Sequence, residues 1–353
     1  MNDLRTPLIE ALRSNAAQWQ AEGSPFYGAL VDRIADDVEA GGPTWTVLSS
    51  HADRPETELP AIRLLDAVHR RVLSGQAPAL VTHYPSTGGD GDAAAAWAPF
   101  LDVVERDGDE LREALDHPVQ TNAVGRCPAI VGGLLTVAAD TGLPVRLLEL
   151  GASAGLLLNS DHYCYEAGSQ AWGDPASPVR FVDSWTGGLP PIGAPLQIAE
   201  RRGCDQHPLD PGRNDDRLDL LSFVWPDQMV RFDLLRSALD VAARFAATVD
   251  RASIPAWLAA NLTPLPTGRV TVVMNSYAWQ YLSDDDAATT QRVLDDAGAA
   301  ATNDAPLAHL SFEALDADYN NTQLRLRLWP GGEDRLLALG GPHLDPVRWL
   351  ARQ

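Results

Sequence analysis

Residues 147–159, which read LLELGASAGLLLN, contain two overlapping patterns that could each support chemistry. Gly151, Ser153 and Gly155 fit the G-x-S-x-G motif of serine hydrolases, whose serine sits on a tight turn between a strand and a helix. Together with Glu149, the same residues fit the glycine-rich turn of a cofactor-binding α/β domain, where glycines let the backbone approach a ligand and Gly155 lets the helix expected after it pack closely. Residues elsewhere in the chain must therefore show whether Ser153 is a nucleophile or part of a cofactor-binding turn.

A hydrolase that uses Ser153 needs an acid and then a histidine later in the chain. Asp250 and the run 284–286 offer the acid, and His309 and His343 offer the base. His309 falls inside a predicted strand, whereas His343 lies in a loop after the last strand. The hydrolase hypothesis therefore depends mainly on His343.

The cofactor hypothesis is supported by polar residues at the ends of four predicted strands. These residues are Glu149, Asp205, Asp250 and Asn275. Parallel strands covered by helices bring their carboxyl ends to one edge of the sheet, which is where open α/β folds bind ligands. In this interpretation Glu149 holds an ammonium group, Asp205 accepts from ribose hydroxyls and Asp250 accepts from an adenine amino group. A rival acid, Asp183, also ends a short strand-like run, so both acids stay open at this point.

The chain is expected to have two parts. Residues 1–127 show apolar side chains at helical spacing and no strong strand pattern, which predicts a helical N-terminal domain or cap. Residues 128–353 predict an α/β domain with a first helix over 128–142 and a proline-rich insertion at about 161–197. The predicted parallel strands are 145–150, 198–205, 245–250, 269–275 and 307–312, and an antiparallel hairpin is predicted over 323–329 and 335–339.

Composition excludes several classes of function. The chain has 27 Lys+Arg against 48 Asp+Glu, a formal net charge of −21, which opposes binding to nucleic acid and to anionic membranes. Every basic residue counted is an arginine, so a P-loop lysine, a Schiff-base lysine and a Ser-Lys dyad are absent. The sequence has no long apolar run or signal pattern, which predicts a cytoplasmic protein without a membrane partner.

The three cysteines form no C-x-x-C pair, so neither a disulfide framework nor a zinc ribbon is indicated. Cys204 and His207 could join His162 and Cys164 around a metal ion, but loosely spaced Cys and His residues are more often structural. No metal is predicted.

Four stretches of the chain resemble an uncharacterised bacterial family catalogued as domain of unknown function 2332. They are residues 119–126, 146–156, 203–210 and 224–228. The predicted strand order in turn resembles the class I S-adenosylmethionine-dependent methyltransferases, whose first-strand motif is acid, any, Gly, any, Gly or Ser, any, Gly. The resemblance implies a Rossmann-like α/β fold of about seven strands whose last hairpin is antiparallel. Two features depart from it: about fifty residues separate the first motif from Asp205, and Asn275 is not followed by Pro-Pro-Tyr.

The resemblance implies that S-adenosylmethionine is the cofactor. Its net positive charge and its lack of pyrophosphate suit an acidic chain without lysine. The implied cofactor contacts are Glu149, Gly151, Ser153, Gly155, Asp205, Asp250 and Asn275.

Other polar and aromatic residues are candidates for catalysis and for substrate binding. Tyr277 and Asp161 could serve as a general base. Asn122 and Arg126 are four residues apart and would share a helix face in a helical segment, where they could clamp a substrate carboxylate. The candidate substrate contacts are Asn122, Arg126, Tyr84 and Trp279.

The sequence therefore predicts a methyltransferase that acts on a small molecule. Two alternatives stay open: a serine hydrolase using Ser153, and a protein that binds S-adenosylmethionine without catalysis. A homodimer is compatible with the sequence but is not indicated by it.

Overall fold

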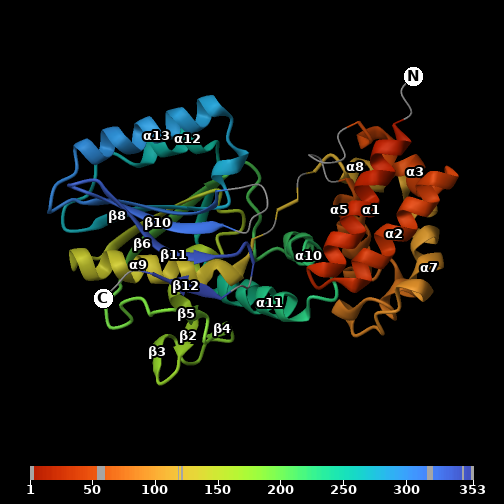
Figure 1. Cartoon of the computed structure of the whole chain (residues 1–353). Helices are drawn as coiled ribbons and strands as arrows, with labels where there is room; N and C mark the ends of the chain where they lie inside the picture. Colours follow the sequence, from red (N-terminus) through yellow and green to blue (C-terminus); the bar gives the residue numbers. More distant parts are fainter. Residues whose placement is uncertain are drawn as a thin grey trace. The chain divides into compact units, whose positions relative to one another are not determined.

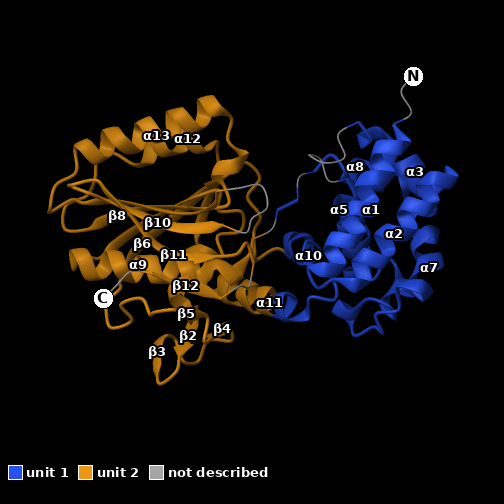
Figure 2. Ribbon diagram, in the orientation of Figure 1, with its two compact units in different colours: residues 1–121, 214–233 blue, residues 122–213, 234–353 orange. Residues whose placement is uncertain are grey.

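The computed structural model describes residues 4–53, 60–117, 119–120, 122–315, 321–343 and 346–350. The chain divides into two compact units (Figure 2). Residues 1–121 and 214–233 form one, here called the helical unit, and residues 122–213 and 234–353 form the other, here called the sheet unit. The segment 214–233 therefore interrupts the sheet unit in the sequence but belongs to the helical unit.

The helical unit contains only helices and loops within its described residues, as the sequence predicts. Its helices are α1 (Arg5–Ala21), α2 (Pro25–Ala40), α3 (Pro43–Leu48), η1 (Ser49–His51), α5 (Pro60–Leu73), α6 (Pro78–Val81), η2 (Pro85–Thr87), α7 (Ala93–Arg106), α8 (Gly108–Ala114) and α10 (Asn214–Ser222). Helix α11 (Met229–Arg244) begins in this unit and ends in the sheet unit.

The segment 214–233 is fixed to the helical unit by apolar and polar contacts. Trp225 packs on Trp19 with 5.4 Å between ring centroids. The Asp227 carboxylate accepts hydrogen bonds from Ser24 Oγ at 2.6 Å and from the Phe26 amide at 2.9 Å, at the start of α2. These bonds satisfy donors that a helix N-terminus leaves without intrahelical partners.

The sheet unit is built around a nine-stranded sheet in the order β5-β12-β11-β10-β9-β8-β1-β6-β7 (Figure 1). Its strands are β1 (Val145–Leu150), β5 (Trp185–Thr186), β6 (Ile198–Asp205), β7 (Thr248–Arg251), β8 (Val270–Ser276), β9 (Leu307–Ala314), β10 (Thr322–Trp329), β11 (Glu333–Gly340) and β12 (Val347–Trp349). The five strands from β7 to β9 are mutually parallel, and β10 and β11 form an antiparallel hairpin, so this part of the prediction is confirmed. The expected number of about seven strands is wrong, because the short strands β5 and β12 extend the sheet.

Helices cover both faces of this sheet, as a parallel sheet of apolar strands requires. Helix α9 (Cys127–Thr141) lies on one face, and α12 (Ile254–Asn261) and α13 (Asp284–Ala299) lie on the other (Figure 1). The helix predicted over 128–142 is therefore confirmed, and Gly142 ends it in the left-handed conformation with φ of 65°. Helix α9 packs closely because Gly133 carries no side chain: a Cβ there would lie 2.4 Å from a methyl carbon of Leu310.

The insertion between β1 and β6 contains no long helix. The glycine turn leads into a six-residue 3₁₀ helix, η4 (Leu157–His162), and then into a separate sheet of β2 (Cys164–Ala167), β3 (Gln170–Gly173) and β4 (Arg180–Val182). The regular helix expected after Gly155 is therefore wrong. Asp183 follows β4 in the small sheet, whereas Asp205 ends β6, the strand that pairs with β1. Asp205 therefore lies beside β1 and Asp183 does not, and the ribose contact of Asp205 stays a prediction.

Candidate functional site

The candidate site lies at the carboxyl edge of the parallel strands, where the strand order reverses. From β1 the chain continues to β6 and β7 on one side of the sheet, and β8 and β9 lie on the other side. Such a reversal opens a crevice at the carboxyl ends of the central strands, and ligands of open α/β sheets bind there. Polar residues at or beside the ends of these strands are Glu149, Asp205, Asp250, Asn275 and Glu313.

Glu149 is buried at this edge and is incompletely hydrogen-bonded by the described residues. Its side chain is buried, with 2% exposure, and its Oε2 atom has no hydrogen-bond partner among the described residues. Burial raises the pKa of Glu149 well above its usual value, and the charge of Asp205 raises it further, while Arg126 and the Leu158 backbone oppose the shift. An uncompensated buried carboxylate costs several kcal/mol, so the group needs either a proton or a cationic partner.

Asn122 approaches the glycine turn from a segment that is not a regular helix. It precedes the short 3₁₀ helix η3 (Val124–Arg126), so the predicted shared helix face of Asn122 and Arg126 is wrong. Its Nδ2 donates to the Ala152 carbonyl at 3.0 Å. Its buried Oδ1 accepts no hydrogen bond from the part of the chain that the structure describes. Asn122 therefore brings an acceptor to the same turn that follows Glu149.

Arg126 is buried and reaches the carboxyl edge from η3. Its Nε donates to the Pro342 carbonyl at 2.7 Å and its Nη1 to the Ser276 carbonyl at 3.2 Å. The guanidinium lies over the Tyr277 ring, 4.1 Å from the centroid, which is a cation–π geometry. Burial lowers the pKa of Arg126, and the nearby Tyr277 and Glu313 oppose that effect.

The Tyr277 ring packs against the Arg126 guanidinium and is itself held by further contacts. Tyr277 has φ of 54°, and its hydroxyl forms a hydrogen bond with Thr322 Oγ1 on β10. Its ring also meets Phe312 edge-on, 6.1 Å between centroids. These contacts fix the ring, and the catalytic role of Tyr277 stays a prediction.

The glycine turn is fastened to the end of β6 by Asp205. One carboxylate oxygen of Asp205 accepts from the Ser153 amide at 2.9 Å and the other from the His207 amide at 2.8 Å. The Gly151 amide donates to the Cys204 carbonyl at 3.0 Å. Asp205 therefore positions the turn, and Ser153 adopts the left-handed conformation with φ of 49°.

Gly151 is needed because another loop packs against it. Its φ is 71°, and a Cβ atom would lie 2.7 Å from the Cβ of Ala278 in the loop after β8. Gly155 has φ of 69°, and a Cβ atom there would lie 3.1 Å from a methyl carbon of Val249. The two glycines thus allow close packing of the turn within the protein.

Two predicted site residues are held in ion pairs. Asp161 pairs with Arg201 through two hydrogen bonds, each 2.8 Å long. Asp250 accepts from Trp257 Nε1 at 2.6 Å and pairs with Arg202, with 2.7 Å between its Oδ2 and Nε. The Arg202 guanidinium lowers the pKa of Asp250. Both carboxylates therefore have structural roles, and their predicted functional roles remain predictions.

Glu313 at the end of β9 is a residue that the sequence analysis missed. Its Oε1 accepts from Asn275 Nδ2 at 2.7 Å, from the Ala278 amide at 2.9 Å and from the Trp279 amide at 3.2 Å. Asn275 Oδ1 in turn lies 2.8 Å from His309 Nε2, so that nitrogen donates. Burial raises the pKa of Glu313, while its hydrogen bonds oppose the shift. Glu313 thus positions the loop that also carries Tyr277.

These contacts settle the places of three further predicted residues. Asn275 is at the edge as predicted, bonded to Glu313. Trp279 is half-buried, with its ring centroid 6.0 Å from that of His309. Tyr84 lies in the core of the helical unit, 5.0 Å from the Phe26 ring between centroids. His309, one candidate base for Ser153, donates instead to Asn275.

A family model described as an uncharacterised protein conserved in bacteria, DUF2332, matches residues 9–349. The chain belongs to the DUF2332 family. The family resemblance inferred from the sequence is therefore confirmed. No curated protein matches the chain.

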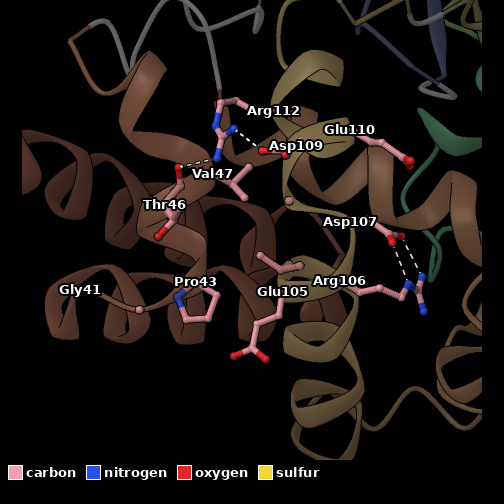
Figure 3. A pocket seen from close by; sticks show the side chains of 13 residues that line it. Gly41, Pro43, Thr46, Val47, Glu105, Arg106, Asp107, Asp109, Glu110 and Arg112 are labelled. Atoms are coloured by element: carbon pink, nitrogen blue, oxygen red, sulfur yellow. Dashed lines mark hydrogen bonds and ion pairs between the residues drawn. The ribbon is translucent and has the colours of Figure 1, made fainter.

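This DUF2332 protein also has a surface pocket in its helical unit, with a volume of ≈ 680 Å³ (Figure 3). The two arginines that line it, Arg106 and Arg112, pair with the lining residues Asp107 and Asp109 at 2.7 and 2.8 Å. Arg106 lowers the pKa of Asp107. Its cations are thus neutralised by their own neighbours, which leaves the carboxyl edge of the sheet unit as the stronger candidate.

Within the described ranges, no group of three or more His, Cys, Asp and Glu side chains is placed to hold a metal ion. None of the helices in these ranges is both long and apolar enough to cross a membrane. The three cysteines, Cys127, Cys164 and Cys204, are buried and reduced.

Proposed function

We propose that the carboxyl edge of the sheet unit binds S-adenosylmethionine and that the protein is a methyltransferase acting on a small molecule. The observation that carries the proposal is the buried Glu149 carboxyl group, whose Oε2 has no donor among the residues described. Glu149 lies near the end of β1, the strand at which the order of the sheet reverses. This is where open α/β sheets bind their ligands.

The chemistry of this edge favours a ligand that carries positive charge and hydrogen-bond donors. Glu149 and Asn122 each bury an oxygen that accepts nothing within the described ranges. An ammonium group has three donors and a charge that stabilises the ionised form of Glu149. S-adenosylmethionine brings an ammonium and a sulfonium, and the net charge of −21 favours it over a ligand with a pyrophosphate.

Of the other two predicted acids, Asp205 fits a contact with the cofactor better than Asp250 does. Asp205 ends the strand next to β1, as expected for an acid that binds ribose, and its oxygens already accept from the Ser153 amide of the glycine turn and from the His207 amide after β6. Asp250 fits an adenine contact less well, because Arg202 and Trp257 occupy its oxygens. The proposal therefore rests on Glu149, Asn122 and Asp205.

Bound S-adenosylmethionine would supply an electrophilic methyl group, whose in-line transfer needs alignment more than acid or base catalysis. The chain supplies that alignment: Asp205 fixes the glycine turn and Glu313 fixes the loop after β8. Tyr277 and Asp161, the candidate bases, bond to Thr322 and Arg201. A nucleophile that carries no proton at neutral pH, such as a carboxylate or a pyridine-type ring nitrogen, therefore suits this site, since it needs no general base.

Titration calorimetry with S-adenosylmethionine and with S-adenosylhomocysteine tests the proposal. We expect micromolar affinity, and we expect Glu149→Gln to weaken it at least about tenfold, roughly 1.4 kcal/mol, because a charge-assisted hydrogen bond is lost. Glu200→Gln is the matched control, since Glu200 is half-exposed near the opposite end of β6 and pairs with Arg146 at 3.2 Å. Absence of binding by folded protein would refute the proposal.

A second candidate function, serine hydrolysis at Ser153, is favoured by one observation. Ser153 has φ of 49°, the left-handed conformation that a tight turn between a strand and the next element requires. In that case Ser153→Ala abolishes hydrolysis, and Glu149→Gln changes stability alone. Binding of S-adenosylmethionine without any methyl transfer would instead support the non-catalytic alternative.

A further inference from the structure

The helical unit contains a serine and a histidine in the geometry of a nucleophile and its base. Ser86 Oγ lies 2.8 Å from His69 Nε2, and His69 Nδ1 lies 3.1 Å from the Ser222 carbonyl oxygen. His69 is on α5, Ser86 is on η2, and Ser222 ends α10, so three separate segments of the unit form this group. A nucleophile, a base within hydrogen-bond reach and a third group that orients the base is the general pattern of covalent catalysis.

The proton positions in this group follow from its partners. A carbonyl oxygen only accepts, so His69 Nδ1 must carry the hydrogen that bonds to Ser222. Burial lowers the pKa of His69 to about 4, so the ring is neutral at neutral pH and its Nε2 is the unprotonated nitrogen. The Ser86 hydroxyl therefore donates to Nε2, which is the arrangement in which the histidine can take the serine proton.

The serine is held in place but is not enclosed. Ser86 is half-buried within η2, whereas His69 is fully buried. The loop around it is closed by hydrogen bonds from the Asp90 amide to the Thr82 carbonyl at 2.9 Å and from Thr87 Oγ1 to the Val81 carbonyl at 2.8 Å. The hydroxyl is thus fixed on a residue that lies at the edge of the core and is partly exposed.

Two buried side chains near His69 have polar atoms without hydrogen-bond partners in the described ranges, which lowers the stability of the folded unit. Asp66, one turn earlier on α5, is 2% exposed, and neither carboxyl oxygen has a partner in the described ranges. The Tyr84 ring lies 5.5 Å from the His69 ring between centroids, and its hydroxyl is also buried without a partner among these residues. Unsatisfied buried groups cost roughly 1–3 kcal/mol each, and more when charged. Such groups concentrate at functional sites.

We propose that Ser86 and His69 form a second reactive centre, in which Ser86 is a nucleophile toward acyl groups. Ser86 Oγ attacks the acyl carbon, and its proton passes to His69 Nε2 and then to the departing alcohol or thiol. Water then attacks the Ser86 ester, again losing a proton to Nε2, and releases the carboxylic acid and the free serine. Because buried His69 is a weak base, the substrates are carboxylic esters or thioesters, whose leaving groups depart more readily than amines.

Labelling with a fluorophosphonate probe, followed by mass mapping of the modified peptide, tests this centre in the wild-type protein. The probe forms a Ser Oγ–phosphorus bond and releases fluoride, so it reports an activated serine without a known substrate. We expect labelling on Ser86, its loss in Ser86→Ala, and a decrease of at least about tenfold in His69→Gln.

Ser74, in the same unit, serves as the matched control. Its hydroxyl bonds to the Arg71 carbonyl at 3.2 Å and to Gln76 Oε1 at 3.2 Å, and not to a base. Ser74→Ala should therefore label like the wild type. Absence of labelling in folded wild-type protein, or a label that maps to a serine other than Ser86, would overturn the proposal.

Discussion

Replacing Asp66 with asparagine should stabilise the protein, and the gain should increase with pH. The Asp66 carboxyl is 2% exposed and has no hydrogen-bond partner among the described residues. Burial raises its pKa well above the usual value, so the folded state holds a proton that the unfolded chain releases near pH 3.9. A raised carboxyl pKa stabilises the fold only at low pH, and that stability is lost as the pH rises towards the folded-state pKa.

The magnitude follows from one linked proton. Between the two pKa values, unfolding releases about one proton from Asp66, so stability falls by about 1.4 kcal/mol per pH unit. Asp66→Asn removes this dependence, while the other buried acids, such as Glu149 and Glu313, contribute equally to both proteins. The difference in unfolding free energy should therefore grow with pH above the unfolded-state pKa, by at most about 1.4 kcal/mol per pH unit, and level off once the pH passes the folded-state pKa.

Guanidinium chloride unfolding at several pH values measures this difference. Asp102→Asn, on the exposed side of α7, is the matched control for the loss of one carboxylate without burial. A constant difference between Asp66→Asn and the wild type would refute the reasoning, because it would show that Asp66 is ionised and compensated in the folded protein.

Three further predictions concern the sheet unit. Glu313→Ala removes the acceptor of three donors and should lower the unfolding free energy by about 2–4 kcal/mol in chemical denaturation, and weaken S-adenosylmethionine binding in calorimetry. Gly151→Ala should cost about 1–3 kcal/mol in the same assay, and Ala278→Gly should restore part of it, because a Cβ at 151 would lie 2.7 Å from the Cβ of Ala278; no restoration would contradict this packing. Asp250→Asn should lower thermal stability by weakening the pair with Arg202 but leave cofactor affinity within about twofold, and a tenfold loss would instead support the adenine contact.

The sequence predicts the parallel core of the fold well because that core has a strong local pattern. β1 (Val145–Leu150) and β6 (Ile198–Asp205) have the predicted bounds. β1 is a mostly apolar run that ends at a glycine, and β6 ends just before the proline turn that follows Asp205. β5 and β12 span two and three residues, which is too short for any periodicity, so they were missed. The helix after Gly155 was expected by analogy and is a 3₁₀ helix instead.

The sequence predicts where the site residues lie, but it does not predict which hydrogen bonds and ion pairs they form. Strand ends can be read from the sequence, which is why Glu149, Asp205 and Asn275 lie at the expected edge. Glu313 was missed because the predicted strand ended one residue earlier. The pair between Asp250 and Arg202 depends on the register of β6 against β7, which no local pattern specifies.

The reactive centre proposed in the helical unit shows the same limit more clearly. His69 and Ser222 are 153 residues apart in the sequence, and only the folded unit brings them together. The sequence around Ser86 does not mark it as reactive, because its histidine partner is known only from the folded structure.

The most direct test of the central claim is the proton balance of cofactor binding. Wild-type protein and Glu149→Gln are titrated with S-adenosylmethionine at one pH near 6.5, in buffers of different ionisation enthalpy. Burial raises the pKa of Glu149 well above its usual value, so a bound ammonium should lower that pKa and release more protons from the wild type than from the variant. No binding by folded protein, or the same affinity and proton balance in both proteins, would contradict the claim that Glu149 forms the cofactor site.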